Sequence, residues 1–135
     1  MRTRLFLAAA CLLLPLCLAA APRHFELRSP DGRLCVGVDA TPELRYTLSY
    51  DGVAILAPSA VELELADAAD YDASVRFEKA IRSSVDVTVP APVYKRAQVR
   101  DHYNQLTLRY KTFELVFRAY DAGMAWRFVS RSRKD

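Results

Sequence analysis

The sequence is poor in the residues that most often build a chemical site. It holds three cysteines and two histidines in 135 residues. Cys11 and Cys17 lie within the segment Met1–Ala21, so Cys35 is the one cysteine left to the remainder and cannot form an internal disulfide. We interpret Cys35 as a small buried hydrophobe. With two histidines and one such cysteine, a zinc site is not expected.

Neither sign of charge dominates. The chain has 19 basic and 16 acidic side chains, and the segment Met1–Ala21 holds two of the basic ones and none of the acidic ones. The remaining 17 basic and 16 acidic side chains do not form the charge pattern of a nucleic-acid-binding or membrane-surface protein. Residues 131–135 form a locally basic tail, which we interpret as a solvated end.

Several familiar motifs are also missing. The chain has no phosphate-binding P-loop, no G-x-G-x-x-G, no H-E-x-x-H, no G-x-S-x-G and no C-x-x-C. Beyond Ala21 no segment has a convincing helical period, and no repeat with a period of about 20 to 50 residues is visible. The sequence therefore carries no local signature of nucleotide binding or of these hydrolases.

Residues 1–21 are predicted to be a signal peptide. Arg2 and Arg4 precede an uncharged apolar run over Leu5–Leu18, and small residues follow at Ala19–Ala21. The run is too short to span a bilayer comfortably, which argues against a membrane anchor. Leu16 before Cys17 argues against a lipid anchor, because that position calls for a small residue. We expect export to the periplasm or outside the cell, without a stable membrane anchor.

From Pro22 the chain reads as short strands separated by turns. Val99–Val129 contains three apolar runs with a period of two, which predicts an antiparallel meander with one buried face. The expected inward-facing residues are Leu106, Leu108 and Tyr110, then Phe113, Leu115 and Phe117, then Met124, Trp126 and Phe128.

Earlier strands are expected between turn signals. Ser29–Gly32 and Asp51–Gly52 have the residues of tight turns, and Pro90–Pro92 should interrupt a strand. Many strands at spacings of roughly 8 to 12 residues predict an all-β antiparallel sandwich or barrel. The predicted strands are His24–Arg28, Arg33–Asp39, Leu44–Tyr50, Val53–Leu56, Ser59–Leu65, Ser74–Ser83 and Val85–Val89, with a loop over Ala66–Asp72.

Two segments of the meander resemble a known family. Asp101–Thr107 reads DHYNQLT and Phe117–Ala125 reads FRAYDAGMA, and Arg82–Asp86 adds a third similar segment. Together they resemble the N-terminal domain of glycoside hydrolase family 97. The resemblance implies a galactose-mutarotase-like super-sandwich ahead of a catalytic (β/α)8 barrel. It covers about the first half of that sandwich, so we expect a partial sandwich domain over residues 22–130.

The resemblance also implies a function. The intact family enzyme would cleave α-glucosidic or α-galactosidic bonds in oligo- or polysaccharides and would depend on calcium, with its catalytic and calcium-binding carboxylates mainly in the barrel. This chain would be an accessory fragment that packs against the missing barrel and helps to shape its site, without catalysis or a cofactor of its own. A free-standing carbohydrate-binding module and a nonfunctional truncated product remain alternatives.

Candidate site residues are few. Asp101 and His102 could suggest an acid–base device, but neighbouring strand residues point to opposite faces, so they should not orient each other. Trp126 is expected in the core. Tyr94, beside the proline-rich loop, and His102 are the candidate carbohydrate-binding residues; no catalytic or metal role is assigned. The acids are expected to cap turns (Asp31, Asp51, Asp70, Asp72, Asp121) or to be solvated on strands (Glu62, Glu64, Glu114).

Overall fold

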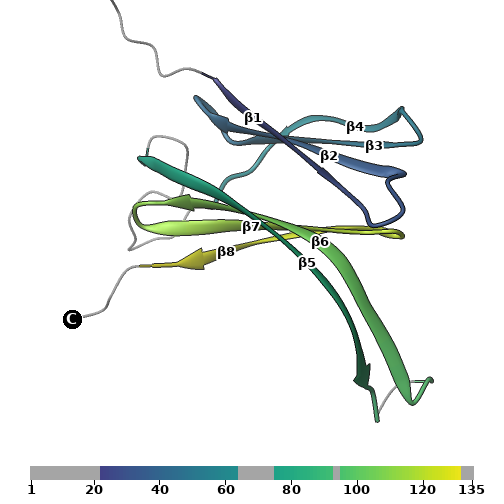
Figure 1. The fold of residues 1–135 in the computed structure, drawn as a ribbon. Coiled ribbons are helices and arrows are strands. Elements are labelled where there is room, and N and C mark those ends of the chain that lie inside the picture. Colours follow the sequence, from purple (N-terminus) through teal and green to yellow (C-terminus); the bar gives the residue numbers. More distant parts are fainter. Residues whose placement is uncertain (1–21, 64–74, 93–94, 132–135) are drawn as a thin grey trace, which may run out of the picture.

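The protein consists of two antiparallel β-sheets packed face to face (Figure 1). The computed structural model describes residues 22–63, 75–92 and 95–131. Within these residues all regular structure is β, which confirms the predicted class, and no helix is long or apolar enough to cross a bilayer. The first sheet contains β1 (Arg23–Arg28), β2 (Leu34–Thr41), β3 (Arg45–Tyr50) and β4 (Val53–Ala60) in that order; the second contains β5 (Phe77–Pro90), β6 (Gln98–Tyr110), β7 (Phe113–Tyr120) and β8 (Gly123–Ser130).

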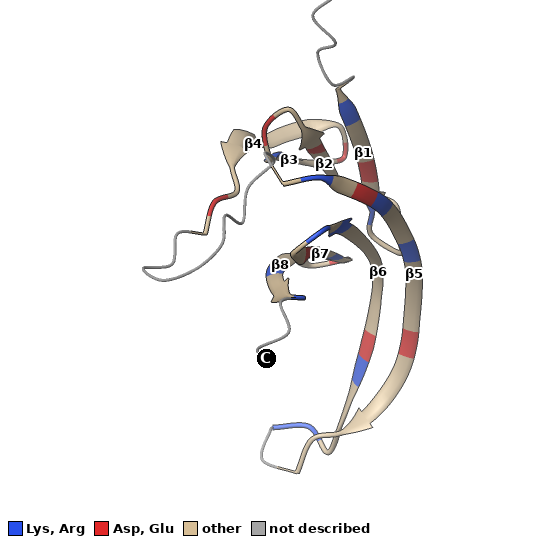
Figure 2. Ribbon diagram, turned by 90° about the vertical axis from the view of Figure 1, so that its left-hand side faces the viewer, with Lys and Arg blue, Asp and Glu red and all other residues tan. Residues whose placement is uncertain are grey.

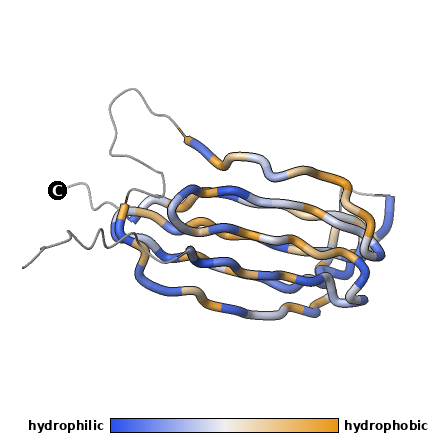
Figure 3. Tube along the Cα trace, turned by 90° about the horizontal axis from the view of Figure 1, so that it is seen from above, coloured by the Kyte–Doolittle hydropathy of each residue, from blue (hydrophilic) through white to orange (hydrophobic). Residues whose placement is uncertain are grey.

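The core lies between β2 and the meander of the second sheet. Hydrophobic and hydrophilic residues alternate along parts of the strands in Figure 3. Because successive side chains of a strand point to opposite faces, every second one points inward. Six predicted inward-facing residues are indeed fully buried: Leu106, Leu108, Tyr110, Phe113, Leu115 and Phe117. They pack on the inward side of the first sheet, including Val36 and Val38. We call this side of each sheet the inner face and the opposite side the outer face.

Tyr110 joins the two sheets at the centre of the core. Its ring stacks on Phe113, with centroids 4.5 Å apart and planes 9° apart, and meets Phe77 edge-on at 5.5 Å. Its hydroxyl donates a 2.7 Å hydrogen bond to the backbone carbonyl of Ala40 in β2. This bond gives a buried polar atom its partner and fixes the first sheet over the second.

The predicted turns are confirmed. Gly32 has φ of 77° and donates a backbone hydrogen bond of 2.9 Å to the carbonyl of Ser29. Asp51 and Gly52, between β3 and β4, have φ of 50° and 79°. Two consecutive residues with positive φ are the signature of a two-residue hairpin turn that matches the twist of its strands.

Replacing Gly52 with alanine should lower the free energy of unfolding by about 1 kcal/mol, because a Cβ is disfavoured at φ of 79°. Gly123→Ala is the matched control, since Gly123 begins β8 directly after a turn, has open space around its Cβ position and does not have a positive φ. Urea denaturation should place the control within about 0.5 kcal/mol of the wild type. Equal losses in both variants would contradict this explanation.

Two of the predicted strand limits near β4 are wrong. The Ala57–Pro58 pair does not end the fourth strand, which runs to Ala60. Pro58 is accommodated because β4 is the edge strand of its sheet and its pairing with β3 is irregular. The predicted strand Ser59–Leu65 does not form as such: its first two residues end β4, and residues 61–63 lie outside any strand.

The two described apolar residues that follow β4 differ in burial. Val61 is buried in the core, whereas Leu63 is 38% exposed. Leu65 and the predicted loop Ala66–Asp72 lie outside the described residues.

The predicted strands Ser74–Ser83 and Val85–Val89 are a single strand, β5, of 14 residues. It pairs with β6 without interruption from Lys79 to Pro90. Ser84 does not break it, because the serine hydroxyl donates a 2.6 Å hydrogen bond to the side-chain oxygen of Asn104, its partner on β6. The strand ends at Pro90, one residue beyond the predicted limit at Val89. β5 and β6 therefore form a hairpin whose two strands are much longer than the other strands (Figure 1).

Trp126 is less buried than predicted. It pairs with Phe117 and therefore belongs to the inner face, but 38% of it is exposed. β8 is the last strand of its sheet, and the main contacts between the sheets join β1 and β2 to β6 and β7. The period of two predicted the face of Trp126 correctly, but it did not predict how completely this side chain is covered.

Candidate functional site

A polar cleft lies where the long β5–β6 hairpin leaves the sandwich. It has a volume of about 580 Å³. Three strands form it: β1 from the first sheet, and β5 and β6 from the second. Its lining is mostly polar and consists of Glu26, Leu27, Arg28, Arg82, Ser83, Ser84, Asn104 and Gln105.

Side chains from the hairpin hold the open edge of β1 at this cleft. Arg82 donates a 2.6 Å hydrogen bond to the carbonyl of Glu26, and the amide of Asn104 donates one of 2.9 Å to the carbonyl of Arg28. Ser84 orients Asn104 through the hydrogen bond described above. Because β1 pairs with β2 on its other side, these bonds satisfy edge carbonyls that no strand covers. We call Arg82, Ser84 and Asn104 the β1 clasp.

His102 lies farther along the same face of the hairpin. It is half-buried and pairs with Asp86 across the two strands. Asp86 makes a bidentate ion pair with Arg100, at 2.7 and 2.8 Å. The hydrogen bond from Arg100, more than the nearby His102, holds the pKa of the Asp86 carboxyl below its ordinary range. This carboxylate is therefore kept ionised, which suits an ion pair and not a general acid at neutral pH.

Asp101 and His102 do not work together, as the strand geometry led us to expect. Asp101 pairs with Val87 and His102 with Asp86, which places the two on opposite faces of β6. The other histidine, His24, is exposed on β1 and lies 2.7 Å from the Asp39 carboxylate. Tyr94, the second candidate binding residue, lies outside the described residues.

The described tyrosines of the second sheet contact other side chains. On its outer face the ring centroids of Tyr103 and Tyr120 are 5.2 Å apart. The Cζ atom of Arg118 lies 4.3 Å from the centroid of the Tyr103 ring. Arg118 also donates a 2.9 Å hydrogen bond to Gln105. Tyr103 is only 6% exposed, so this stack does not offer it as an open platform.

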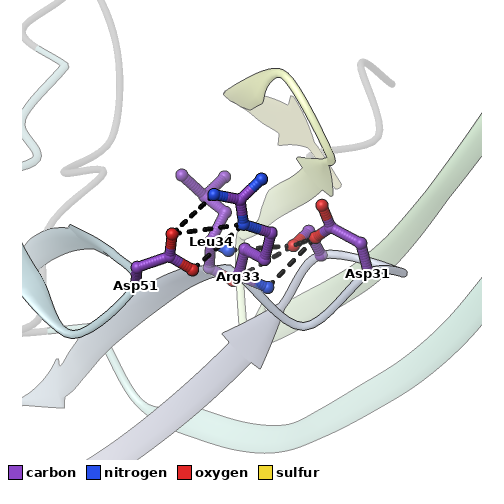
Figure 4. Close-up of polar contacts among 5 residues, drawn as sticks. Asp31, Arg33, Leu34 and Asp51 are labelled. Atoms are coloured by element: carbon purple, nitrogen blue, oxygen red, sulfur yellow. Dashed lines mark hydrogen bonds and ion pairs between the residues drawn. The ribbon is translucent and has the colours of Figure 1, made fainter.

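Of the described turn aspartates, Asp31 caps its own turn as predicted (Figure 4), whereas Asp51 and Asp121 bind residues elsewhere in the chain. Asp31 accepts hydrogen bonds from the Ser29 hydroxyl at 2.5 Å and the Arg33 amide at 3.0 Å, and the bond from Ser29 is the main cause that lowers the pKa of this carboxyl. Asp51 pairs with the Arg33 guanidinium at 2.6 Å, which lowers the pKa of Asp51. Asp121 accepts a 2.9 Å bond from the Asp31 amide and so ties the two sheets together.

The remaining acids divide between ion pairs and solvent. Glu114 pairs with Arg109 at 2.7 Å, and Glu62 is exposed just after β4. Asp70, Asp72 and Glu64 lie outside the described residues. Across residues 22–63, 75–92 and 95–131, no three His, Cys, Asp or Glu side chains are close enough to hold a metal ion.

Cys35 is a correction to the sequence interpretation. It is a free cysteine and only partly buried, because it lies on the outer face of β2, between the inward-pointing Leu34 and Val36. Sequence reasoning also missed the β1 clasp. Arg82 and Asn104 stand in the segments that carry the family resemblance, but only the packing of β1 across the hairpin shows what they bind.

These features place the chain among antiparallel β-sandwich domains. The family model described as "Glycosyl-hydrolase 97 N-terminal" matches residues 27–134. The chain therefore belongs to the family of N-terminal domains of glycoside hydrolase family 97 enzymes, which confirms the resemblance of its motifs.

Known relatives are much longer than this chain. The "Retaining alpha-galactosidase" of Bacteroides thetaiotaomicron is 37% identical over 125 residues, which are 92% of this chain and 19% of the relative. A family 97 enzyme in complex with acarbose, from Pseudoalteromonas sp. strain K8, and a β-arabinopyranosidase share the fold, with TM-scores of 0.69 and 0.71. Each is 20% identical, and the likeness covers 81% of this chain and 18% of the other. The chain thus spans less than a fifth of these relatives.

Proposed function

We propose that this chain is an accessory part of a family 97 glycoside hydrolase, in which it packs against a catalytic (β/α)8 barrel and helps to shape the site. The observation that carries the proposal is the match of residues 27–134 to the family's N-terminal domain, in relatives that have more than four-fifths of their length elsewhere. In this role the chain performs no catalysis itself.

The ionisation of the described acids supports the same role. Glycoside hydrolysis uses two carboxyl groups, one of which is an acid with a raised pKa. The shifts resolved for Asp31, Asp51 and Asp86 are all downward and are caused by hydrogen bonds within the fold. These carboxylates hold turns and strands together and are poorly suited to donate a proton.

The substrate of the intact enzyme is proposed from its relatives. One relative is a retaining α-galactosidase, so an α-galactoside or α-glucoside within an oligo- or polysaccharide is the proposed substrate class. The described residues do not fit a calcium site, because calcium takes six to eight oxygen ligands and no cluster of three acidic side chains is present among them. His102 and Tyr94 stay predictions as saccharide contacts. Residues 1–21 are proposed to direct export to the periplasm or the medium.

A simple assay tests the absence of catalysis. The mature chain, incubated with nitrophenyl α-galactoside and α-glucoside in the presence of Ca²⁺, should release no nitrophenol above the blank. The intact Bacteroides thetaiotaomicron α-galactosidase provides the positive control for the galactoside. Turnover that is retained through purification of this chain would overturn the proposal.

A further inference from the structure

The first sheet ends in two edge strands, β4 and β1, which differ in how they resist pairing with a further strand. β4 contains Pro58, which has no peptide N–H to donate, and its pairing with β3 is irregular. β1 contains no proline, and its pairing with β2 is regular from His24 to Arg28. A regular edge of this kind is a template for another strand unless something covers it. On β1 the cover consists of the side chains of the β1 clasp.

The clasp binds two peptide carbonyls of the β1 edge. In an antiparallel pair the peptide groups of alternate residues bond the partner strand, and those of the residues between them point away. The carbonyls of Glu26 and Arg28 point away from β2, because they accept the hydrogen bonds from Arg82 and Asn104. The N–H groups of Glu26 and Arg28 point the same way. Side chains alone reach these carbonyls, since the cleft of about 580 Å³ lies between β1 and the hairpin.

The charges of β1 favour one register in which two copies could pair through this edge. The acidic Glu26 lies between the basic residues Arg23 and Arg28, as the colours along β1 in Figure 2 show. In an antiparallel two-fold pair centred on Leu27, Glu26 of each copy faces Arg28 of the other. Opposite charges across a strand pair stabilise it. Centring the pair one residue earlier or later would place Glu26 opposite Glu26 or Arg28 opposite Arg28, which is unfavourable.

The register that the charges favour requires the same two carbonyls that the clasp binds. With Glu26 opposite Arg28, the carbonyl of each would accept a hydrogen bond from the N–H of the facing residue. Within one chain Arg82 and Asn104 take these acceptor positions, and their side chains stand where the second strand would lie. We infer that the β1 clasp is an autoinhibitory contact, which prevents β1 from pairing edge to edge with β1 of a second copy.

Removing the clasp should therefore make the chain dimerise. Sedimentation equilibrium would compare the mature chain with the double variant Arg82→Ala/Asn104→Ala. The wild type should be monomeric, and the double variant should dimerise at least about tenfold more tightly, because pairing no longer displaces two hydrogen bonds. Hydrogen exchange locates the interface. The N–H groups of Glu26 and Arg28 should be protected in the dimer and exchange rapidly in the monomer.

Thr88→Ala/Arg100→Ala is the matched control. These two exposed residues pair with each other farther along the hairpin, on the same face as the clasp, and Arg100 bonds Asp86 of the hairpin itself. The control also loses one arginine and one smaller polar residue, but it keeps both bonds to β1, so it should stay monomeric. Dimerisation of the control to the same extent as the clasp variant would contradict the inference.

The charge register provides a second test. Adding Glu26→Lys to the clasp variant should return it to a monomer, because like charges then face each other. Adding Arg28→Glu as well restores opposite charges and should restore the dimer. If neither change alters the dimer, the two copies do not pair through β1 in this register and the inference fails.

Three other results would overturn it. The first is a clasp variant that stays monomeric while circular dichroism shows an unchanged sandwich. The second is association that leaves the N–H groups of Glu26 and Arg28 unprotected, and the third is a wild type that already pairs through β1. If the double variant does not fold, Arg82→Ala alone keeps the bond from Asn104 to Arg28 and should dimerise with a smaller gain in affinity. A folded Arg82→Ala variant with no gain would count against the clasp in the same way.

Discussion

Phe113→Ala should lower the free energy of unfolding by about 3 to 5 kcal/mol, the usual range for a buried phenylalanine. Phe113 is fully buried, stacks on Tyr110 and lies 5.5 Å from the ring of Phe128. Because it begins β7 directly after the turn from β6, its loss would leave a cavity where both strands meet the first sheet. A domain of this size has a total stability of about 5 to 15 kcal/mol, so this single change should remove a large part of it.

Trp126→Ala is the informative control for that experiment. Tryptophan is the larger side chain, and sequence reasoning placed it in the core, but 38% of it is exposed. Its replacement should cost clearly less than the loss of Phe113, about 1 to 2 kcal/mol, because an exposed side chain gives up less buried area. Urea denaturation of both variants gives the comparison. A larger loss at Trp126 than at Phe113 would show that the core is centred elsewhere.

The same contrast shows what the sequence can predict about this fold. The period of two gives the inner face of β8 correctly, but the burial of Trp126 depends on how the other sheet packs over that face. The Asp51–Gly52 turn is predictable because its φ angles depend on those two residues alone. The continuity of β5 through Ser84 is not, since it depends on a partner on β6 that lies 20 residues away.

The structure also explains the segments that carry the family resemblance. Residues of DHYNQLT on β6 and of FRAYDAGMA on β7 and β8 contact one another: Tyr103 meets Tyr120, and Gln105 accepts a hydrogen bond from Arg118. Asp121 reaches back to the first sheet through the Asp31 amide. The motifs thus hold β6 and β7 together within the second sheet, and Asp121 adds one bond to the first sheet.

Only part of the candidate site could be predicted from the sequence. His102 could be placed on one face of a strand, and its separation from Asp101 followed from strand geometry alone. The β1 clasp could not be found in this way, because Arg82 and Asn104 bind backbone carbonyls of β1, a strand that lies far earlier in the chain and in the other sheet. A side chain that binds a distant backbone leaves no pattern of paired residue types in the sequence.

Tyr110→Phe should change how stability depends on alkaline pH. Burial raises the pKa of the Tyr110 phenol above its ordinary value of about 10. Above pH 10 the unfolded chain therefore loses this proton while the folded protein keeps it, so stability falls as pH rises, by about 1.4 kcal/mol per unit of pH for this one group. Below pH 10 both the folded and the unfolded chain keep the Tyr110 proton, so its contribution to stability is fully present.

The phenylalanine variant cannot show that decline. It should instead be about 1 kcal/mol less stable than the wild type between pH 7 and 9, because the carbonyl of Ala40 loses its hydrogen bond from the phenol. The two stability curves should then converge and cross at about pH 11. There the stability that the wild type loses through ionisation of Tyr110 in its unfolded state exceeds the stability that the variant lacks without the hydrogen bond. Urea denaturation at half-unit steps from pH 8 to pH 11.5 measures both curves. Tyr120→Phe, on the outer face, should keep the wild-type decline. Parallel curves for Tyr110→Phe and the wild type would mean that the phenol is not held in the core as the structure shows.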